Sequence, residues 1–294
     1  MHQHNHKHHY DESSSRIGLA FFLNAIFTII EFIGGWLTNS TAIMADAVHD
    51  LGDSLSIGSA WLLNRLGKKS ANGEFTYGYR RLSLLGALIN GLVLIVGSLW
   101  ILSEAIPRLM DPVMPVTEGM LGLAILGIAV NGYAAFKLNS GKTLNEKILN
   151  WHLLEDVLGW VAVFIVSIIL LFFQWPILDP ILSIFFTIFI LINVGRNFYS
   201  TIKLFLQAVP DPRIIDRVRE ILLEFNEVDG VHHLHFWSLD GERNVMTVHV
   251  ELEKSYDAAS LLNLKIKISE SLECFELEHT TIEFEFPDEV CRDQ

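Results

Sequence analysis

Six stretches of mostly apolar residues, each about 20 residues long, dominate the first two-thirds of the chain. They run over residues 16–37, 41–64, 82–105, 118–138, 150–173 and 178–200. A helix of that length is long enough to cross the hydrocarbon core of a bilayer. The pattern therefore predicts a six-helix transmembrane domain over residues 16–208, surrounded by lipid.

A different pattern begins at residue 209 and continues to residue 294. Helical apolar spacing is seen over residues 213–225 and 256–272, and alternating apolar residues are seen over 230–239, 244–252 and 280–286. The Asp240-Gly241 pair between the first two alternating segments is typical of a hairpin turn. The order α-β-β-α-β predicts a small sheet with two helices on one face.

Composition and charge separate the two parts of the chain. The 294 residues are 51% hydrophobic, and the mean hydropathy of +0.37 is unusually high for a soluble protein. From residue 209 onward, 8 basic and 20 acidic residues give a net charge of −12, against −13 for the whole chain. We therefore expect an acidic soluble domain after a nearly neutral membrane domain, and no nucleic-acid partner.

Basic residues in the short loops predict the orientation of the chain, because such loops stay in the cytoplasm. They gather on one side, at Arg65, Lys68, Lys69, Arg80, Arg81, Lys137, Lys142 and Lys147, whereas the opposite loops carry little besides Arg108. Both termini are then cytoplasmic. A disulfide between Cys274 and Cys291 is not expected in that reducing compartment. We expect Cys274 to be a buried apolar residue, and Cys291 to be either a soft metal ligand or a free thiol.

The segment 1–15 is predicted to be a disordered cytoplasmic N-terminus. It carries histidines at positions 2, 4, 6, 8 and 9, interrupted by other polar residues. Several imidazoles in such a tract can gather divalent metal loosely. An expression tag is the alternative interpretation.

Two short patterns inside the apolar segments predict a metal site. His49 and Asp53 lie four residues apart in the second segment, and His152 and Asp156 have the same spacing in the fifth. On a helix, residues four apart share a face, so two facing pairs supply two nitrogens and two oxygens for a tetrahedral Zn²⁺ shell. Ionisable groups at bilayer depth indicate function by default. For the other polar residues of the spans, Asn24, Glu31, Asn90 and Asn131, we expect hydrogen bonds between helices.

Several blocks resemble the cation diffusion facilitator family of zinc transporters, across essentially the whole chain after residue 15. They are Glu31-Phe-Ile-Gly-Gly-Trp36, Ala45-Asp-Ala-Val-His-Asp-Leu-Gly-Asp53, Phe75-Thr-Tyr-Gly-Tyr-Arg-Arg-Leu82, the His152 and Asp156 pair, and Val231-His-His-Leu-His-Phe-Trp237. The likeness is greatest to bacterial exporters with His at the first ligand position of the second segment. Asp50 departs from the family pattern, and we interpret it as lining or orienting the site.

The resemblance implies a homodimer in the bacterial inner membrane that exports Zn²⁺ in exchange for protons. Its transport ligands would be His49, Asp53, His152 and Asp156. It also implies a ferredoxin-like cytoplasmic domain that dimerises and binds further, structural or regulatory, zinc. The candidate ligands there are His232, His249, His279 and Glu285. No organic cofactor is expected. Strand alternation predicts that His232, His233 and His235 cannot all share one face.

Three other functions are open to a chain of this kind. A membrane metalloenzyme would need an open zinc position and a general base, and Glu155 is the nearest candidate for that base. A metal-gated channel would need a continuous pore, often with rings of repeated side chains. A structural or sensory protein would use zinc only in its tail. The paired ligands favour a transporter over an enzyme, since four protein ligands close the shell.

Overall fold

The computed structural model describes residues 5–67, 71–139 and 144–293. Lys68, Lys69 and Lys142, which contribute to the expected orientation, lie outside these ranges, as do the histidines at positions 2 and 4. The chain forms two compact units. One comprises Met1–Ser59 and Ile89–Asn197, and the other comprises Ala60–Leu88 and Phe198–Gln294.

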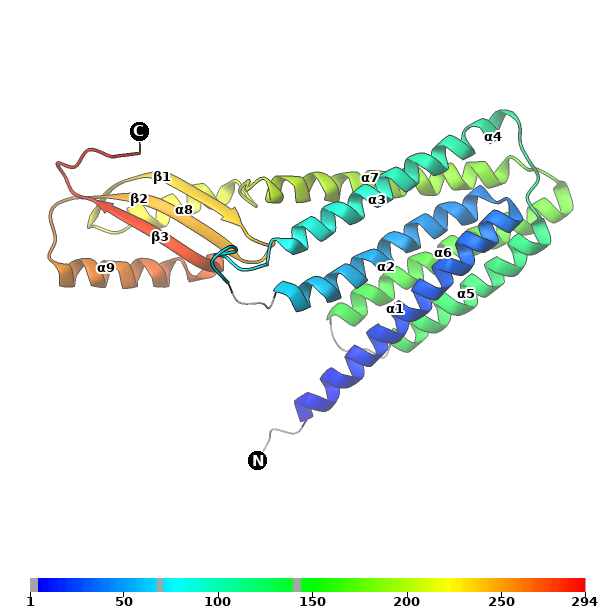
Figure 1. Ribbon diagram of the computed structural model, residues 1–294, viewed down its shortest axis with the longest axis horizontal. Coiled ribbons are helices and arrows are strands. Elements are labelled where there is room, and N and C mark those ends of the chain that lie inside the picture. The colour runs from blue at the N-terminus through cyan, green and yellow to red at the C-terminus, as the bar shows by residue number, and fades with distance from the viewer. Residues whose placement is uncertain (1–4, 68–70, 140–143, 294) are drawn as a thin grey trace. The chain divides into compact units, whose positions relative to one another are not determined.

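Long helices run side by side in the first unit (Figure 1). The helices of the first two-thirds of the chain are α1 (Asn5–Thr38), α2 (Thr41–Gly67), α3 (Leu82–Ala105), the short α4 (Pro107–Met110), α5 (Thr117–Asn139), α6 (Leu144–Phe173) and α7 (Leu178–Phe205). Each of the six predicted segments falls within one long helix or differs from it by a few residues, and α4 is added where Pro107 follows α3. Within the described residues, five helices are long and apolar enough to cross a membrane.

The helix α2 is not among those five, and α1 is longer than predicted. Asp46, His49, Asp50 and Asp53 lower the hydropathy of α2, so a count by composition passes over the helix that carries half of the predicted site. The helix α1 begins at Asn5. Its first turns therefore fall within residues 1–15, which the sequence predicts to be a disordered N-terminus.

A close approach between α5 and α6 fixes the helix that carries the second ligand pair. The ring of Trp160 on α6 is fully buried, and a Cβ atom on Gly127 of α5 would lie 2.2 Å from it. Only glycine leaves room for the indole there. Phe27 of α1 meets the same ring edge-on, with 5.5 Å between the ring centroids. Trp160 follows Asp156 by one helical turn, so this packing supports the predicted site directly.

The C-terminal domain has the predicted order of elements, with bounds shifted by a few residues. They are α8 (Arg213–Leu223), β1 (Val228–Ser238), β2 (Asn244–Leu252), α9 (Ala258–Ser271), the 3-10 turn η1 (Glu273–Phe275) and β3 (Leu277–Glu285). The sheet order is β1-β2-β3, with β1 and β2 antiparallel and β2 and β3 parallel. The predicted turn lies between β1 and β2, and Gly241 there adopts the left-handed φ of 101° that favours glycine.

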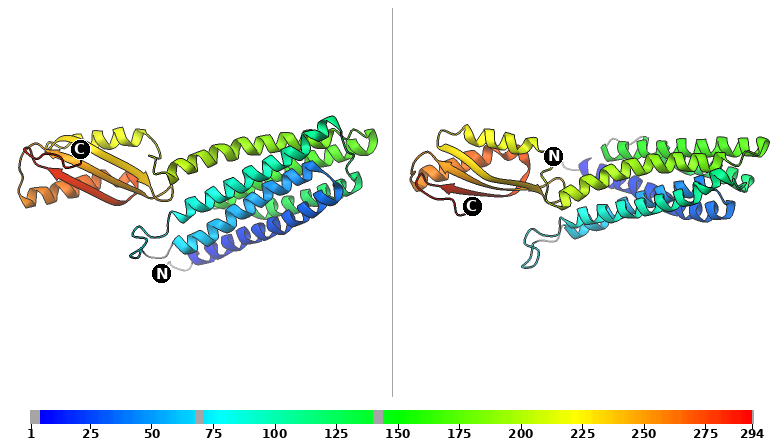
Figure 2. Two further views of the ribbon diagram at one scale, coloured as in Figure 1. Left: turned by 45° about the horizontal axis from the view of Figure 1, so that its top comes forward. Right: turned by 90° about the horizontal axis from the view of Figure 1, so that it is seen from above.

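Both helices pack on the same side of this sheet (Figure 2). Val218 of α8 and Ile268 of α9 share one core with Met246, Val248 and Val250 of β2. Successive side chains on a strand point to opposite faces, so His249 belongs to the face that the helices do not cover. The predicted fold class thus holds at the level of a mostly helical chain followed by a small sheet domain.

The expectation that Cys274 is buried is wrong. The helix α9 ends at Ser271, and the short turn η1 follows it. Phe275 turns into the core and is 8% exposed, while Cys274 is exposed to solvent. The turn breaks the helical period that the prediction assumed, and so rotates Cys274 outward.

Candidate functional site

The four predicted transport ligands lie together between α2 and α6. The Oδ2 atom of Asp53 lies 3.0 Å from Nε2 of His152 and 3.6 Å from Nε2 of His49. His152 Nε2 lies 3.8 Å from Oδ2 of Asp156, its partner on α6. One donor atom each from His49, His152 and Asp156 falls within 4.8 Å of the other two. The pair on α2 and the pair on α6 therefore face each other.

One oxygen of each carboxylate in this cluster is buried without a hydrogen bond, although both oxygens lie near the His152 imidazole. Asp156 is only 5% exposed, and within the described residues neither its Oδ2 nor that of Asp53 has a hydrogen bond. Buried polar atoms are normally paired, so these oxygens need a partner of another kind. Two imidazole nitrogens and two carboxylate oxygens suit Zn²⁺, and a cation bound among them would be that partner.

Three more carboxyl groups are buried on α1 and α2, and one of them, Asp46, was not among the residues expected at the site. Glu31, Asp46 and Asp50 are 0%, 8% and 1% exposed. Asp46 faces α6, because a Cβ atom on Gly159 would lie 3.8 Å from its Oδ1. Its spacing from His49 was the signal that could have identified it, since residues three apart are neighbours on a helix surface.

The hydrogen bonds expected between helices are present at two of the polar positions. Asn24 Nδ2 donates to Ser54 Oγ at 3.4 Å, and Asn90 Nδ2 donates to Ser56 Oγ at 2.6 Å. In the described part of the chain, no such bond of normal geometry is found for the carboxylate oxygens of Glu31 or for Nδ2 of Asn131. Both asparagine bonds end on α2 one or two turns beyond His49, and so help to hold the ligand-bearing helix.

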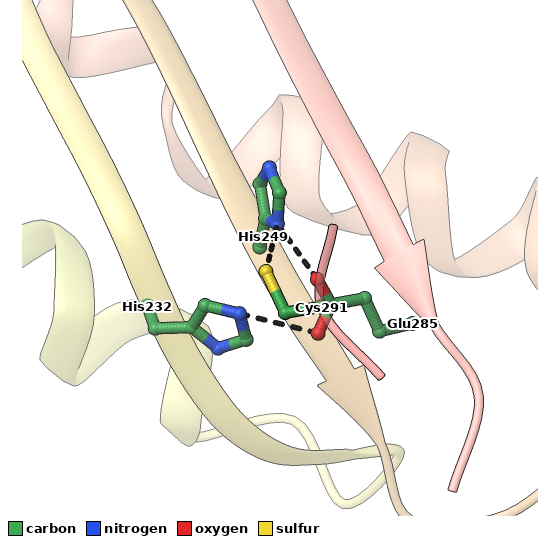
Figure 3. A group of neighbouring side chains, drawn as sticks. All are labelled: His232, His249, Glu285 and Cys291. Atoms are coloured by element: carbon green, nitrogen blue, oxygen red, sulfur yellow. Dashed lines mark hydrogen bonds and ion pairs between the residues drawn. The ribbon is translucent and has the colours of Figure 1, made fainter. Parts of the chain in front are cut away.

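A second cluster of candidate ligands lies on the uncovered face of the C-terminal sheet (Figure 3). It joins His232 of β1, His249 of β2, Glu285 of β3 and Cys291 from the segment after β3. His249 Nδ1 lies 2.7 Å from Glu285 Oε1, and His232 Nε2 lies 3.2 Å from Glu285 Oε2. The Cys291 Sγ atom lies 3.6 Å from His249 Nδ1.

The membership of this cluster differs from the expected set at His279 and is decided at Cys291. His279 lies at the other end of β3, where it pairs with Val245 and its ring meets Tyr77 with 5.0 Å between centroids. It is therefore separated from Glu285 along the strand and does not join the cluster. Cys291 does join it, which the sequence left open, because the chain turns back over the sheet after β3. The Pro287-Asp288 pair is a sequence signal for that turn, which the bond from Glu289 N to Phe286 O closes at 2.9 Å.

A bulge in β1 overturns the prediction for the three neighbouring histidines. The register with β2 shifts by one residue between His232 and His235, and His233 takes a φ of 46°. As a result the ring of His233 lies 5.1 Å from those of both His232 and His249, and 6.5 Å from that of His235. Simple alternation fails where an extra residue enters the strand.

Electrostatics in the C-terminal cluster favour the ionised carboxylate of Glu285, which is the form that binds a metal ion. Burial raises the pKa of its carboxyl, but hydrogen bonds with His249 and Cys291 outweigh this and hold the pKa below its ordinary value. Burial raises the pKa of the Cys291 thiol, and the charges of Glu285 and Asp293 add to the effect. A bound cation would reverse the second shift, since a metal favours the thiolate.

Comparison with known proteins covers both parts of the chain. Residues 17–206 match the cation efflux transmembrane domain, and residues 210–285 match the cytoplasmic domain of cation efflux proteins. The chain is 34% identical to zinc transporter ZitB of Pectobacterium atrosepticum over 288 residues, covering 96% of this chain and 89% of the relative.

Two further relatives are similar over almost the same length. The cadmium, cobalt and zinc/H(+)-K(+) antiporter of Bacillus subtilis is 32% identical over 284 residues, which is 95% of this chain and 91% of that protein. Zinc transporter ZitB of Escherichia coli is 33% identical over 282 residues, which is 94% of this chain and 88% of that protein. The family matches and these near-complete alignments show that the chain belongs to the cation efflux family.

Proposed function

We propose that this protein is a secondary transporter that exports Zn²⁺ from the cytoplasm in exchange for protons. The observation that carries the proposal is the meeting of His49 and Asp53 with His152 and Asp156, where the Oδ2 atom of each aspartate is buried without a hydrogen bond. The names of the relatives support both the metal and the coupling, since they describe zinc transporters and a metal/H(+)-K(+) antiporter. Those names describe transporters and antiporters rather than enzymes.

Proton coupling follows from the chemistry of the ligands. Zinc binds neutral imidazole and carboxylate, so a proton on His49 or His152 competes directly with the metal. Histidine exchanges protons near physiological pH, with an ordinary pKa of about 6.5. If the site opens in turn to each side of the membrane, zinc leaves where protons bind and loads where they are released. Efflux is then driven by an inward proton gradient.

The proposed architecture is a homodimer of six-span protomers in the bacterial inner membrane. The helix α2 would be the sixth span, since its polar residues are used by the transport site. Both termini would be cytoplasmic, in keeping with the match of residues 210–285 to a cytoplasmic domain. That domain would be ferredoxin-like and would contribute to dimerisation.

The C-terminal cluster is proposed to hold a structural or regulatory zinc ion. Its donors are His232, His249, Glu285 and Cys291, from three strands and the following segment. His279 is left out because it lies at the other end of β3. Zinc at this position would stabilise the domain, while transport would depend on the membrane site alone.

Transport by everted membrane vesicles tests the proposal. Zinc uptake should require an imposed pH gradient, and Asp156→Ala should abolish uptake because it removes a buried ligand. Glu155→Gln is the matched control. It changes an exposed neighbour on the same helix and should transport like the unmodified protein.

The same assay separates the competing functions. Uptake that is indifferent to the pH gradient would indicate a channel. Zinc binding without uptake would indicate a structural or sensory protein. Full transport by Asp156→Ala would show that the four-residue site is assigned wrongly.

A further inference from the structure

Asp179, near the start of α7, forms buried hydrogen bonds with the residues at the start of α2. It is not one of the proposed metal ligands. Its side chain is 1% exposed. Ser40 Oγ donates to its Oδ1 at 2.5 Å, and Ala42 N donates to the same oxygen at 3.3 Å. The backbone N and the hydroxyl of Thr41 donate to its Oδ2 at 2.7 Å and 2.9 Å. Four donors thus satisfy a carboxylate that would be costly to bury alone.

The donors belong to Ser40, just before α2, and to the first two residues of that helix, which begins at Thr41. The first backbone N–H groups of a helix have no partner within the helix, and a carboxylate placed there satisfies them and complements the helix dipole. Ser40, the residue just before the helix, supplies the ordinary N-cap, since its Oγ accepts from Ile43 N at 3.2 Å. The Asp179 carboxylate adds to this cap from a residue 138 positions away in the sequence, so it also ties α2 to α7.

A polar stripe on α7 strengthens this contact. The buried residues of α7, which is described along its whole length, are Asp179, Pro180, Ser183 and Thr187. Ser183, one turn after Asp179, donates to the Thr41 carbonyl at 2.9 Å. Hydrogen bonds between helices matter more in a bilayer than apolar contacts, because lipid offers the apolar contacts equally well.

The same helix α2 carries His49 and Asp53. Eight residues separate Thr41 from His49, which at 1.5 Å per residue places the cap about 12 Å from the first ligand. A helix is stiff over two turns, so a shift or rotation at its N-terminal end moves both ligands relative to those on α6. A metal shell tolerates only a fraction of an ångström of such movement.

We infer that Asp179 is a positioning residue for the transport site, which sets the height and rotation of α2 by capping it from α7. The inference rests on the proposed transport function. It assigns Asp179 no contact with the transported ion. Its effect passes through His49 and Asp53.

The experiment measures the zinc KM and the maximal rate of full-length variants in everted vesicles. Asp179→Asn keeps the shape of the side chain. It replaces one accepting oxygen with an NH₂ group, which cannot accept the hydrogen bonds that the start of α2 donates. We expect it to raise the zinc KM about tenfold or more, the size of effect that follows the loss of groups that orient metal ligands. Thr187→Ala is the matched control, because its hydroxyl lies on the same buried stripe but donates to Ser183 O of α7 itself rather than to α2. Its KM should be unchanged.

The split between KM and rate separates positioning from mere stability. A purely structural role would lower the amount of folded protein, and hence the maximal rate, with an unchanged KM. That result for Asp179→Asn would overturn the inference. If Asp179→Asn does not fold, Thr41→Val takes its place, because it removes one hydroxyl donor to Asp179 Oδ2 and leaves both the carboxylate and the Ser40 cap in place. A several-fold rise in KM supports the inference and an unchanged KM overturns it. Asp156→Ala in the same assay reports separately on the proposed transport site.

Discussion

At the scale of single residues, the two ligand clusters differ in the donor atoms that they offer. The membrane cluster combines histidine with carboxylate, whereas the C-terminal cluster adds the sulfur of Cys291. Thiolate is a softer ligand than carboxylate and binds zinc strongly. The C-terminal cluster should therefore retain zinc more tightly than a site that must release its ion in every transport cycle.

Replacement of Cys291 tests this difference. Cys291→Ala should weaken zinc binding to the segment 209–294 about tenfold or more, because one donor of the shell is lost. Isothermal titration with zinc measures the change. Cys274→Ala removes the other, exposed cysteine and should bind zinc like the parent. Equal affinities for the two variants would exclude Cys291 as a ligand.

The histidines of the membrane site predict the pH dependence of transport. Each ligand must lose its proton before zinc binds, so the apparent affinity should fall as the pH drops from about 7.5 to 5.5 through the ordinary range of histidine. The zinc KM in vesicles, measured with the loading side buffered across this range, reports the effect. A KM that does not change with pH would contradict direct competition between protons and zinc.

At the scale of elements, the contact between α5 and α6 controls where the second ligand pair lies. Trp160 follows Asp156 by one turn and occupies the space that a side chain at Gly127 would need. The packing of large rings against glycine brings two helix backbones close together, which is common between membrane helices. The proposed transport site would therefore depend on Gly127, a residue that carries no functional group.

Paired glycine substitutions on α5 test this dependence. Gly127→Ala forces the helices apart, so it should lower both thermal stability and zinc transport. Gly132→Ala places the same methyl group where no atom lies within 4 Å, and should leave transport unchanged. The melting temperature in detergent and the rate of zinc uptake are the measurements. Equal behaviour of the two variants would show that the close contact with Trp160 is dispensable.

At the scale of the whole molecule, charge opposes the assembly of two C-terminal domains. Each carries −12 from residue 209 onward, and like charges repel across an interface unless cations offset the field. Zinc bound by His232, His249, Glu285 and Cys291 would reduce that charge on each domain. We therefore expect zinc to stabilise the domains and to draw them together.

Thermal melting of the segment 209–294 tests this expectation. Zinc in about hundredfold excess over its dissociation constant should raise the melting temperature by roughly 10 °C or more. Replacement of both His232 and His249 by alanine should remove the increase. Replacement of His279, which lies outside the cluster, should not. A melting temperature that does not respond to zinc would exclude the C-terminal site.

Patterns among residues close together in the sequence determined the helical segments and the order of elements in this protein. The length and spacing of apolar residues predicted the helical segments and the order of elements after residue 209, because partition into lipid and the periods of helix and strand depend on residues close together in the chain. The spacing of four between His49 and Asp53, and between His152 and Asp156, likewise placed each pair on one helix face. The predicted and observed orders of these elements agree because each element is determined by residues that are close together in the chain.

Only the tertiary structure decided which distant residues meet. The cap that Asp179 places on α2, the return of Cys291 to His249 and the approach of Trp160 to Gly127 each join segments that no local pattern relates. The bulge at His233 and the outward turn of Cys274 changed the faces that regular periods predicted. Such contacts depend on how many side chains pack at once, and a one-dimensional period carries no information about that packing.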